Sequence, residues 1–247
     1  MQPLLLPLFN TDQPQALRAC IQMDLPMKVL LPLILAFTAF SASAAVQIES
    51  SRVIYPGANK SASLTIRNTA TKDYLVQSWL DGDGKGQEKS SLMVVTPPLL
   101  KLKPAQAATL RFIYSGQGLP EDRESMLWIN VQEIPPKANQ ANVMQLAIRT
   151  RLKLFYRPAS LTTTIEKEVL KLKKQYIPGG IDFINSGPLN ITLSSLKVKD
   201  KNGKLRDILP SVVKPFSTEF IALPAGTTLT SFSYINDYGG VIPFGTK

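Results

Sequence analysis

Apolar and polar residues alternate with a period of two along much of this chain. Runs rich in Val, Ile, Leu, Thr and aromatic residues are separated by clusters of Gly, Pro, Asn and Asp. This pattern is typical of half-buried strands joined by turns, and no long helical period accompanies it. Seven such runs in about 110 residues predict an immunoglobulin-like β-sandwich. The predicted strands are Val46–Tyr55, Ser61–Arg67, Tyr74–Leu80, Leu92–Val95, Ala108–Tyr114, Met126–Ile134 and Val143–Tyr156.

The second half of the chain carries a further set of strand-like runs. Asn202-Gly203 lies between two of them and indicates a hairpin. We therefore expect an all-β protein with an N-terminal sandwich over residues 45–157 and a smaller β domain over residues 158–247, with the boundary near Pro158. The predicted strands of the second domain lie within Leu161–Tyr176, Gly180–Phe183, Ile191–Val198, Leu205–Leu209, Val213–Leu223 and Leu229–Ile235.

The N-terminal segment has the pattern of an export signal. Lys28 precedes an apolar run over residues 29–40, and small residues with an A-x-A pattern follow up to Ala44. We therefore predict that residues 1–44 are a secretory signal peptide, because the run is too short for a comfortable membrane span. Two acidic residues lie upstream of Lys28, so we expect the true start to be Met27 and the preceding part to be an over-long extension.

Composition excludes several kinds of chemistry. The 247 residues include no His and one Cys, Cys20, which belongs to the predicted signal segment. Ser-His-Asp and Cys-His catalysis, His- or Cys-ligated zinc and internal disulfides are thereby excluded. The formal net charge of +10 is spread along the chain, so no nucleic-acid-binding arm is indicated. Asp81-Gly-Asp-Gly-Lys fails the calcium-loop pattern, because Leu92 stands at its twelfth position. No metal or cofactor is expected.

The run Val143–Tyr156 is the most informative segment. Met144, Leu146 and Ile148 share one parity, whereas Arg151 and Lys153 share the other. One interpretation is an ordinary last strand of the sandwich with one buried face. The other is an edge strand that offers apolar side chains and unpaired backbone groups to a partner. The pattern alone leaves both open.

Four separated motifs resemble one known family. They are Leu119-Pro-Glu-Asp-Arg-Glu-Ser-Met-Leu-Trp-Ile-Asn-Val-Gln-Glu-Ile-Pro-Pro136, Thr96-Pro-Pro98, Leu152-Lys-Leu-Phe-Tyr-Arg-Pro158 and Tyr234-Ile-Asn-Asp-Tyr-Gly-Gly240. Together they resemble the periplasmic pilus (fimbrial) chaperones of the chaperone–usher pathway. The resemblance implies two immunoglobulin-like domains in an L shape with a cleft between them. It also implies binding of pilus subunits and adhesins by donor-strand complementation, followed by delivery to an outer-membrane usher.

The resemblance also implies three groups of site residues. The first anchors the C-terminal carboxylate of the subunit, the second supplies the donor side chains, and the third forms an inter-domain salt-bridge network. These groups are Arg52 with Lys153, then Met144 with Leu146 and Ile148, and finally Arg111 with Glu124 and Asp237. In a regular strand, Lys153 would face away from the donor residues, and the sequence does not resolve this conflict.

Two further features qualify the resemblance. The segment over residues 134–143 is short, as in the short-loop branch of the family, whose members typically build rod-like pili with adhesive tips. The chain ends at Lys247, so we expect the last strand of the second domain to be short or missing. An exposed donor strand can also pair with a second copy, which allows a dimer of the free protein.

Alternative functions belong to other classes of protein. A pilus structural subunit would be a single incomplete domain, usually with Cys and without the Arg-Glu-Ser…Ile-Pro-Pro element. A sandwich that binds carbohydrates or polyanions is permitted by the net charge, although no cluster of aromatic and basic residues marks a surface for it. An enzyme is the least favoured alternative, because no nucleophile–base pair or phosphate loop is visible.

Overall fold

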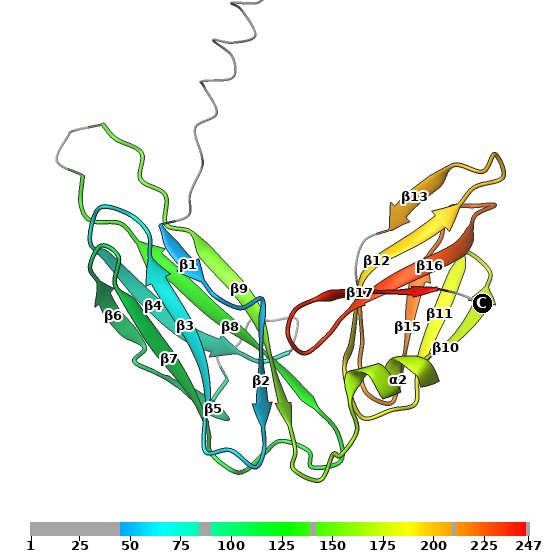
Figure 1. Cartoon of the computed structure of the whole chain (residues 1–247), viewed down its shortest axis with the longest axis horizontal. Helices are drawn as coiled ribbons and strands as arrows, with labels where there is room; N and C mark the ends of the chain where they lie inside the picture. Colours follow the sequence, from blue (N-terminus) through cyan, green and yellow to red (C-terminus); the bar gives the residue numbers. More distant parts are fainter. Residues whose placement is uncertain (1–44, 84–89, 139–141, 209–210, 246–247) are drawn as a thin grey trace, which may run out of the picture. The chain divides into compact units, whose positions relative to one another are not determined.

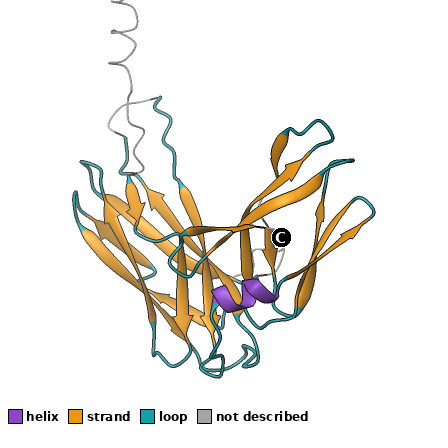
Figure 2. Ribbon diagram, turned by 45° about the vertical axis from the view of Figure 1, so that its right-hand side comes forward, coloured by secondary structure: helices purple, strands orange, loops and turns teal. Residues whose placement is uncertain are grey.

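Two β-sandwiches make up the part of the chain that the structure describes. The computed structural model describes residues 45–83, 90–138, 142–208 and 211–245. Strands account for nearly all of the regular structure there, and α2 is the one helix among these residues (Figures 1 and 2). The all-β prediction with two immunoglobulin-like domains is thereby confirmed. The predicted signal peptide, residues 1–44, lies outside the described residues.

The N-terminal sandwich consists of two sheets. One sheet has the strand order β1-β3-β7-β5, and the other has the order β2-β9-β8-β4-β6. Within these sheets β2 and β9 pair in parallel, and the other neighbours pair antiparallel. The strands are β1 (Val46–Ile48), β2 (Arg52–Pro56), β3 (Ala62–Asn68), β4 (Tyr74–Asp81), β5 (Met93–Thr96), β6 (Leu99–Leu102), β7 (Ala107–Tyr114), β8 (Ser125–Ile134) and β9 (Arg149–Arg157).

The chain crosses from one sheet to the other at two places that were not predicted from the sequence. The predicted strand Val46–Tyr55 is two strands, because β1 pairs with β3 whereas β2 pairs with β9 in the other sheet. Pro97 and Pro98 separate β5 from β6, and these two strands also lie in different sheets. The sequence analysis missed β6. These crossings close the sandwich at both edges.

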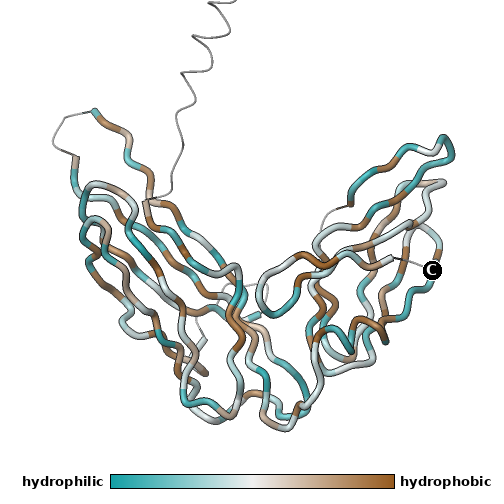
Figure 3. Tube along the Cα trace, in the orientation of Figure 1, coloured by the Kyte–Doolittle hydropathy of each residue, from teal (hydrophilic) through white to brown (hydrophobic). Residues whose placement is uncertain are grey.

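Alternate residues of the strands fill the space between the two sheets. Fully buried members include Leu64, Ile66, Phe112, Ile129 and Leu154. The alternation of apolar and polar positions can be followed along the strands in Figure 3. Each sheet therefore packs its inner face against the core, and its outer face remains available for other contacts.

The C-terminal sandwich is built from two smaller sheets. One has the order β10-β11-β15; the other has the order β13-β12-β16-β17, and β14 pairs with β12. Asp200 and Lys204 close the predicted hairpin at Asn202-Gly203, where Gly203 has a φ of 83°. The strands are β10 (Lys173–Ile177), β11 (Gly180–Asn185), β12 (Ile191–Lys199), β13 (Leu205–Ile208), β14 (Ser211–Val213), β15 (Ser217–Ala222), β16 (Thr228–Ile235) and β17 (Val241–Gly245).

The last strand of this domain is present. From the sequence this strand was expected to be short or missing; it is present as β17, which pairs with β16 over five residues, from Val241 opposite Ile235 to Gly245 opposite Ser231. Phe244 stacks on Phe232 with their ring centroids 4.9 Å apart. The edge of the second domain is therefore formed by a paired strand.

The run Leu161–Tyr176, predicted as strand, contains a short helix and is a strand only from Lys173 onward. Helix α2 spans Ile165–Lys171, and β10 begins two residues later. Ile165 and Val169 are buried one turn apart against the second core, with Glu residues in the first turn and Lys171 in the last. That spacing and charge order suit a helix, so the sequence did carry a signal, but it covers only seven residues.

Candidate functional site

Strand β9 has an unpaired edge at its start. Its pairing with β8 covers residues from Arg149 to Tyr156, whereas its pairing with β2 begins only at Lys153. Within the described chain, residues 149–152 therefore have a strand neighbour on one side only. Unpaired backbone groups along such an edge can hydrogen-bond to an added strand.

The segment before β9 extends this edge with exposed apolar side chains. Residues 142–148 belong to no strand in the structure, so the predicted long strand Val143–Tyr156 is confirmed only from Arg149 onward. Met144 is 86% exposed, Leu146 is 71% exposed and Ile148 is 48% exposed. These exposures exclude the interpretation in which the three residues pack in the protein's own core.

Local sequence explains why most of this segment stays unpaired. The Glu133 amide of β8 donates to the Ile148 carbonyl at 3.0 Å. Strand β8 then ends at Ile134 and two prolines follow, so it offers no further ladder to residues 142–147. Gln145 points the other way, toward the chain that leaves β8: its amide nitrogen donates to the Pro136 carbonyl at 2.6 Å. Its side-chain oxygen accepts from the Ala138 amide at 3.2 Å. Gln145 therefore holds the segment near β8 while its apolar neighbours remain free.

Arg52 and Lys153 form a pair of adjacent cations, called here the anchor pair. They are register partners at the start of the parallel pairing between β2 and β9. Arg52 is buried and Lys153 is half-buried. Arg52 donates to the Ile235 carbonyl at 3.4 Å, and its Nε has no hydrogen-bond partner among the described residues. Neither cation forms an ion pair with a described carboxylate, so the pair is free to bind an anion.

Burial makes this pair of charges costly. Burial and the neighbouring Arg52 together lower the pKa of Lys153 to about 8, and Asp83 opposes this change. Burial also lowers the pKa of Arg52 from its ordinary value, against the influence of Asp237 and Glu124. Two partly desolvated like charges gain most from a carboxylate that binds both of them.

Aromatic rings flank the anchor pair on the same face of the sheet. Trp128 is the register partner of Lys153, and the Lys153 ammonium lies 5.6 Å from the centre of its ring. The guanidinium of Arg151 lies 4.5 Å from the same ring. The buried Asp81 accepts from the Asn130 amide at 2.9 Å and lies 3.5 Å from Arg151. Asp81 therefore directs Arg151 over Trp128, and the sequence analysis identified none of these supporting residues.

The opposite parity of Lys153 and the donor residues now has a structural basis. Leu152 and Leu154 are buried in the core. Met144, Leu146 and Ile148 occupy positions of the same parity in the sequence. Lys153 lies on the outer face of the sheet. The register from Arg149 to Tyr156 is continuous, so no bulge lies within β9. Met144, Leu146 and Ile148 precede the strand and share the sequence parity of its core-side residues, while Lys153 stands on its outer face.

The predicted salt-bridge network forms around a different cation. Glu124 and Asp237 are joined by Arg157, whose Nε donates to Glu124 at 3.0 Å and whose Nη1 and Nη2 donate to Asp237 at 2.7 Å and 2.9 Å. The other oxygen of Glu124 accepts from the Asn190 backbone amide at 2.9 Å. Burial lowers the pKa of Arg157, but its bonds to Asp237 and Glu124 outweigh burial and raise this pKa above its ordinary value.

The structure does not bring Arg111, predicted as a member of this network, to Glu124 and Asp237. Arg111 lies exposed on β7, in the other sheet, opposite Ser63 and Thr96. Within the described ranges it forms no ion pair with Glu124 or Asp237. Arg157 belongs to the motif Leu152–Pro158. The position of this motif at the predicted domain boundary was the sequence signal that could have identified Arg157 as the central cation.

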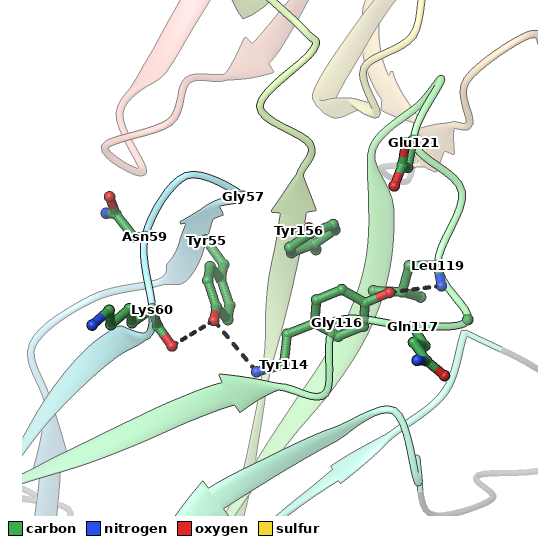
Figure 4. Close-up of a pocket in the computed structure, with 11 residues that line it drawn as sticks. Tyr55, Gly57, Asn59, Lys60, Tyr114, Gly116, Gln117, Leu119, Glu121 and Tyr156 are labelled. Carbon is green, nitrogen blue, oxygen red and sulfur yellow. Dashed lines mark hydrogen bonds between the residues drawn. The ribbon is translucent and has the colours of Figure 1, made fainter.

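A separate cavity of about 440 Å³ lies at the other end of β2 and β9. Its walls include Tyr55, Tyr114 and Tyr156, whose rings contact one another (Figure 4). The Tyr55 hydroxyl donates to the Lys60 carbonyl at 2.9 Å, and the Tyr114 hydroxyl accepts from the Leu119 amide at 2.9 Å. Because these hydroxyls brace the surrounding loops, we assign this cluster a structural role.

Neither a metal site nor a membrane-spanning helix is present among the described residues. They contain no group of three or more His, Cys, Asp or Glu side chains that could hold a metal ion. None of the helices among them is long and apolar enough to cross a membrane.

Two family models match this chain and together cover almost all of its described part. Residues 45–162 match the model described as pili and flagellar-assembly chaperone, PapD N-terminal domain. Residues 166–244 match the model described as pili assembly chaperone PapD, C-terminal domain.

Individual proteins agree with these models. The chaperone protein LpfB of Salmonella typhimurium is 42% identical over 219 residues, which cover 84% of this chain and 90% of LpfB. The crystal structure of the YadV chaperone has 31% identity and a TM-score of 0.70, covering 82% of this chain and 99% of that one. A structure of the Salmonella enterica SafA pilin in complex with the SafB chaperone matches with 26% identity and a TM-score of 0.72, covering 84% and 98%.

Proposed function

Because the chain belongs to the PapD family of pilus assembly chaperones, we propose that it binds nascent pilus subunits and adhesins by donor-strand complementation. It protects them from aggregation and delivers them to an outer-membrane usher. The complex of SafA pilin with SafB chaperone supports a subunit as the partner. A subunit that lacks one strand exposes an apolar groove and strand edges, which is an aggregation hazard.

The observation that carries this proposal is the unpaired edge that leads to the anchor pair. Exposed apolar side chains at Met144, Leu146 and Ile148 precede residues 149–152, whose edge is free, and the edge ends at Lys153 beside Arg52. One continuous stretch thus offers side chains for a groove, backbone groups for a ladder and cations for a carboxylate. These are the three elements that donation of a strand requires.

The geometry of β2 gives the direction of the added strand. A strand beside residues 142–152 lies in line with β2 and meets its first residue, Arg52. If the C-terminal carboxylate of the subunit binds the anchor pair, the C-terminal end of that strand points toward Lys153. The strand then runs parallel to β9, as β2 does. The fixed carboxylate also sets the register, because a slip by one residue would turn every side chain to the wrong face.

The free energy of capture is dominated by the apolar contacts. Burying Met144, Leu146 and Ile148 contributes roughly 1.5–3 kcal/mol each, or roughly 5–9 kcal/mol before costs. Ordering of the segment and loss of translational freedom offset a large part of this gain. The carboxylate contact therefore serves mainly to select and align the end of the subunit.

The remaining parts of the proposal concern location and organisation. We place the protein in the periplasm after removal of a signal peptide near Ala44, and we assign it no catalytic activity. The region that matches the N-terminal model ends at residue 162, and the region that matches the C-terminal model begins at residue 166. These limits support a domain boundary just after Pro158. Arg157 with Glu124 and Asp237 would fix the two domains to each other, which is a role for which buried ion pairs are suited. The compact segment between β8 and β9 supports the short-loop branch.

Co-purification tests this function directly. Arg52→Ala and Lys153→Ala variants, expressed with a pilus subunit of the same organism, should recover much less subunit than the unmodified protein. Arg111→Ala is the matched control, because Arg111 is an exposed arginine on the other sheet. Undiminished recovery with both anchor variants would contradict the proposed role of the anchor pair.

A further inference from the structure

An ion pair joins the two domains near the row of residues that contains Lys153. Lys214 of the C-terminal domain contacts Asp83 of the N-terminal domain with 2.5 Å between Nζ and Oδ2. Asp83 comes two residues after Asp81, the end of β4, and Asp81 is in register with Trp128, which is in register with Lys153. Asp83 therefore lies two residues beyond the row of register partners that contains Lys153.

Asp83 acts electrostatically on the anchor pair. It is the carboxylate that opposes the lowering of the pKa of Lys153. The carboxylates that act on Arg52 are instead Asp237 and Glu124, which are both held by Arg157. Asp83 is thus the acid within the described part of the chain that could neutralise Lys153 in place of the carboxylate of a subunit.

Asp83 and Lys214 border an open space and are partly exposed. Asp83 and Lys214 line a cavity of about 370 Å³, together with Ser90 and Leu92 from the following strand region and Met126 of β8. The Asp83 side chain is 29% exposed and that of Lys214 is 53% exposed. Exposed ion pairs of this kind contribute little to the stability of the fold, so stabilisation is not the main effect of this pair.

We propose that Lys214 is a positioning residue that holds the Asp83 carboxylate toward the C-terminal domain and so keeps Lys153 available to the carboxylate of a subunit. This inference rests on the proposed function and adds to it a residue of the second domain that sets the strength of the anchor. Without Lys214, Asp83 turns to Lys153 and competes with the subunit. Without Asp83, Lys214 has nothing to hold and its removal has no effect on the anchor.

Titration of Lys153 in the protein without a subunit tests the inference. The ε-carbon signals of ¹³C-labelled lysines are followed by NMR against pH, with Lys153→Arg used for assignment. Lys214→Gln should raise the pKa of Lys153 by about one pH unit, because an opposite charge moves closer. Asp83→Asn should lower it, and Lys214→Arg should leave it unchanged.

The double variant separates the inference from the simple loss of a nearby positive charge. In the Asp83→Asn background, Lys214→Gln should have no effect on the pKa of Lys153. An equal rise in both backgrounds would mean that Lys214 acts only through its own charge and would overturn the inference. No rise in either background would overturn it as well.

Binding of a peptide supplies the second readout. The probe is the C-terminal peptide of a pilus subunit, made with a free carboxylate and as its amide. Lys214→Gln should weaken binding of the acid about fivefold, Asp83→Asn should strengthen it, and the double variant should resemble Asp83→Asn. Glu49→Gln and Arg67→Gln are the matched controls, since this exposed pair, 3.8 Å apart, lies on the other sheet.

The two peptides also separate failure of the inference from failure of the proposed function. Equal binding of acid and amide by the unmodified protein would contradict the anchoring role of Arg52 and Lys153. A clear preference for the acid that does not change in Lys214→Gln would leave the function intact and overturn only the role of Lys214.

Discussion

Lys153 is half-buried beside a second cation, and this environment decides how pH affects binding. A lysine at the surface keeps its proton far above neutral pH, but burial and Arg52 lower the pKa of Lys153 to about 8. Alternation in the sequence could show that Lys153 faces away from the core, but not that it lies next to Arg52. That neighbour comes from the parallel pairing of β2 with β9, which joins residues about a hundred positions apart.

Binding of a subunit carboxylate should therefore weaken at alkaline pH. The bound carboxylate favours the protonated lysine, so the complex has the higher pKa and binding takes up a proton. Affinity is full well below pH 8 and falls as pH rises through that value, by about 30-fold between pH 7 and pH 9.5. Titration of the C-terminal peptide of a subunit by fluorescence anisotropy measures this change. Lys153→Arg should give a flat profile, and an equal slope in both proteins would refute this origin.

Arg157 should be the residue of the salt-bridge network on which stability depends most. Arg157→Gln leaves Glu124, whose side chain is 2% exposed, without its cation and should cost about 3–5 kcal/mol of the free energy of unfolding. Arg111→Gln, at an exposed position, should change it by less than about 0.5 kcal/mol. Urea denaturation measures both values. Comparable effects of the two substitutions would show that the network has been assigned to the wrong arginine.

At the scale of elements, periodicity predicted most strands and failed where tertiary contacts decide. The run Val46–Tyr55 has one continuous strand-like pattern, yet its two ends pair with different sheets. Helix α2 was missed because seven residues give a weak helical period. The segment before β9 has a strand-like pattern because its residues alternate as those of β9 do, but β8 hydrogen-bonds only its last residue, Ile148. That failure coincides with the candidate site, where the alternation is suited to a partner and not to the protein's own core.

The apolar residues before β9 should affect capture without affecting stability. Leu146 is 71% exposed, so Leu146→Glu should change the free energy of unfolding by less than about 0.5 kcal/mol and sharply reduce co-purification of a subunit. Leu154 has the same parity but is fully buried, so Leu154→Ala should cost about 2–5 kcal/mol. Thermal unfolding and subunit recovery, measured on both variants, check this contrast. Unimpaired recovery with Leu146→Glu would argue against donation by this segment.

At the scale of the whole molecule, the sequence predicted two sandwiches and, through a resemblance, the family to which the chain belongs. Matched motifs also pointed to Arg52 and Lys153, which the structure places side by side, and to Met144, Leu146 and Ile148, which it leaves exposed. The central cation Arg157 and the contact between Lys214 and Asp83 did not, because each joins residues of two domains that are distant in the sequence. Such contacts depend on how the two sandwiches meet, and no local pattern encodes that.

Amide hydrogen exchange of residues 142–152, with and without a bound pilus subunit, tests the central claim most directly. In the free protein these amides should exchange quickly where they lack strand partners, because nothing protects them. In the complex the segment should become strongly protected, while the other exposed loops of the N-terminal domain stay unchanged. Equal exchange of the segment in the free and the subunit-bound protein would contradict the account.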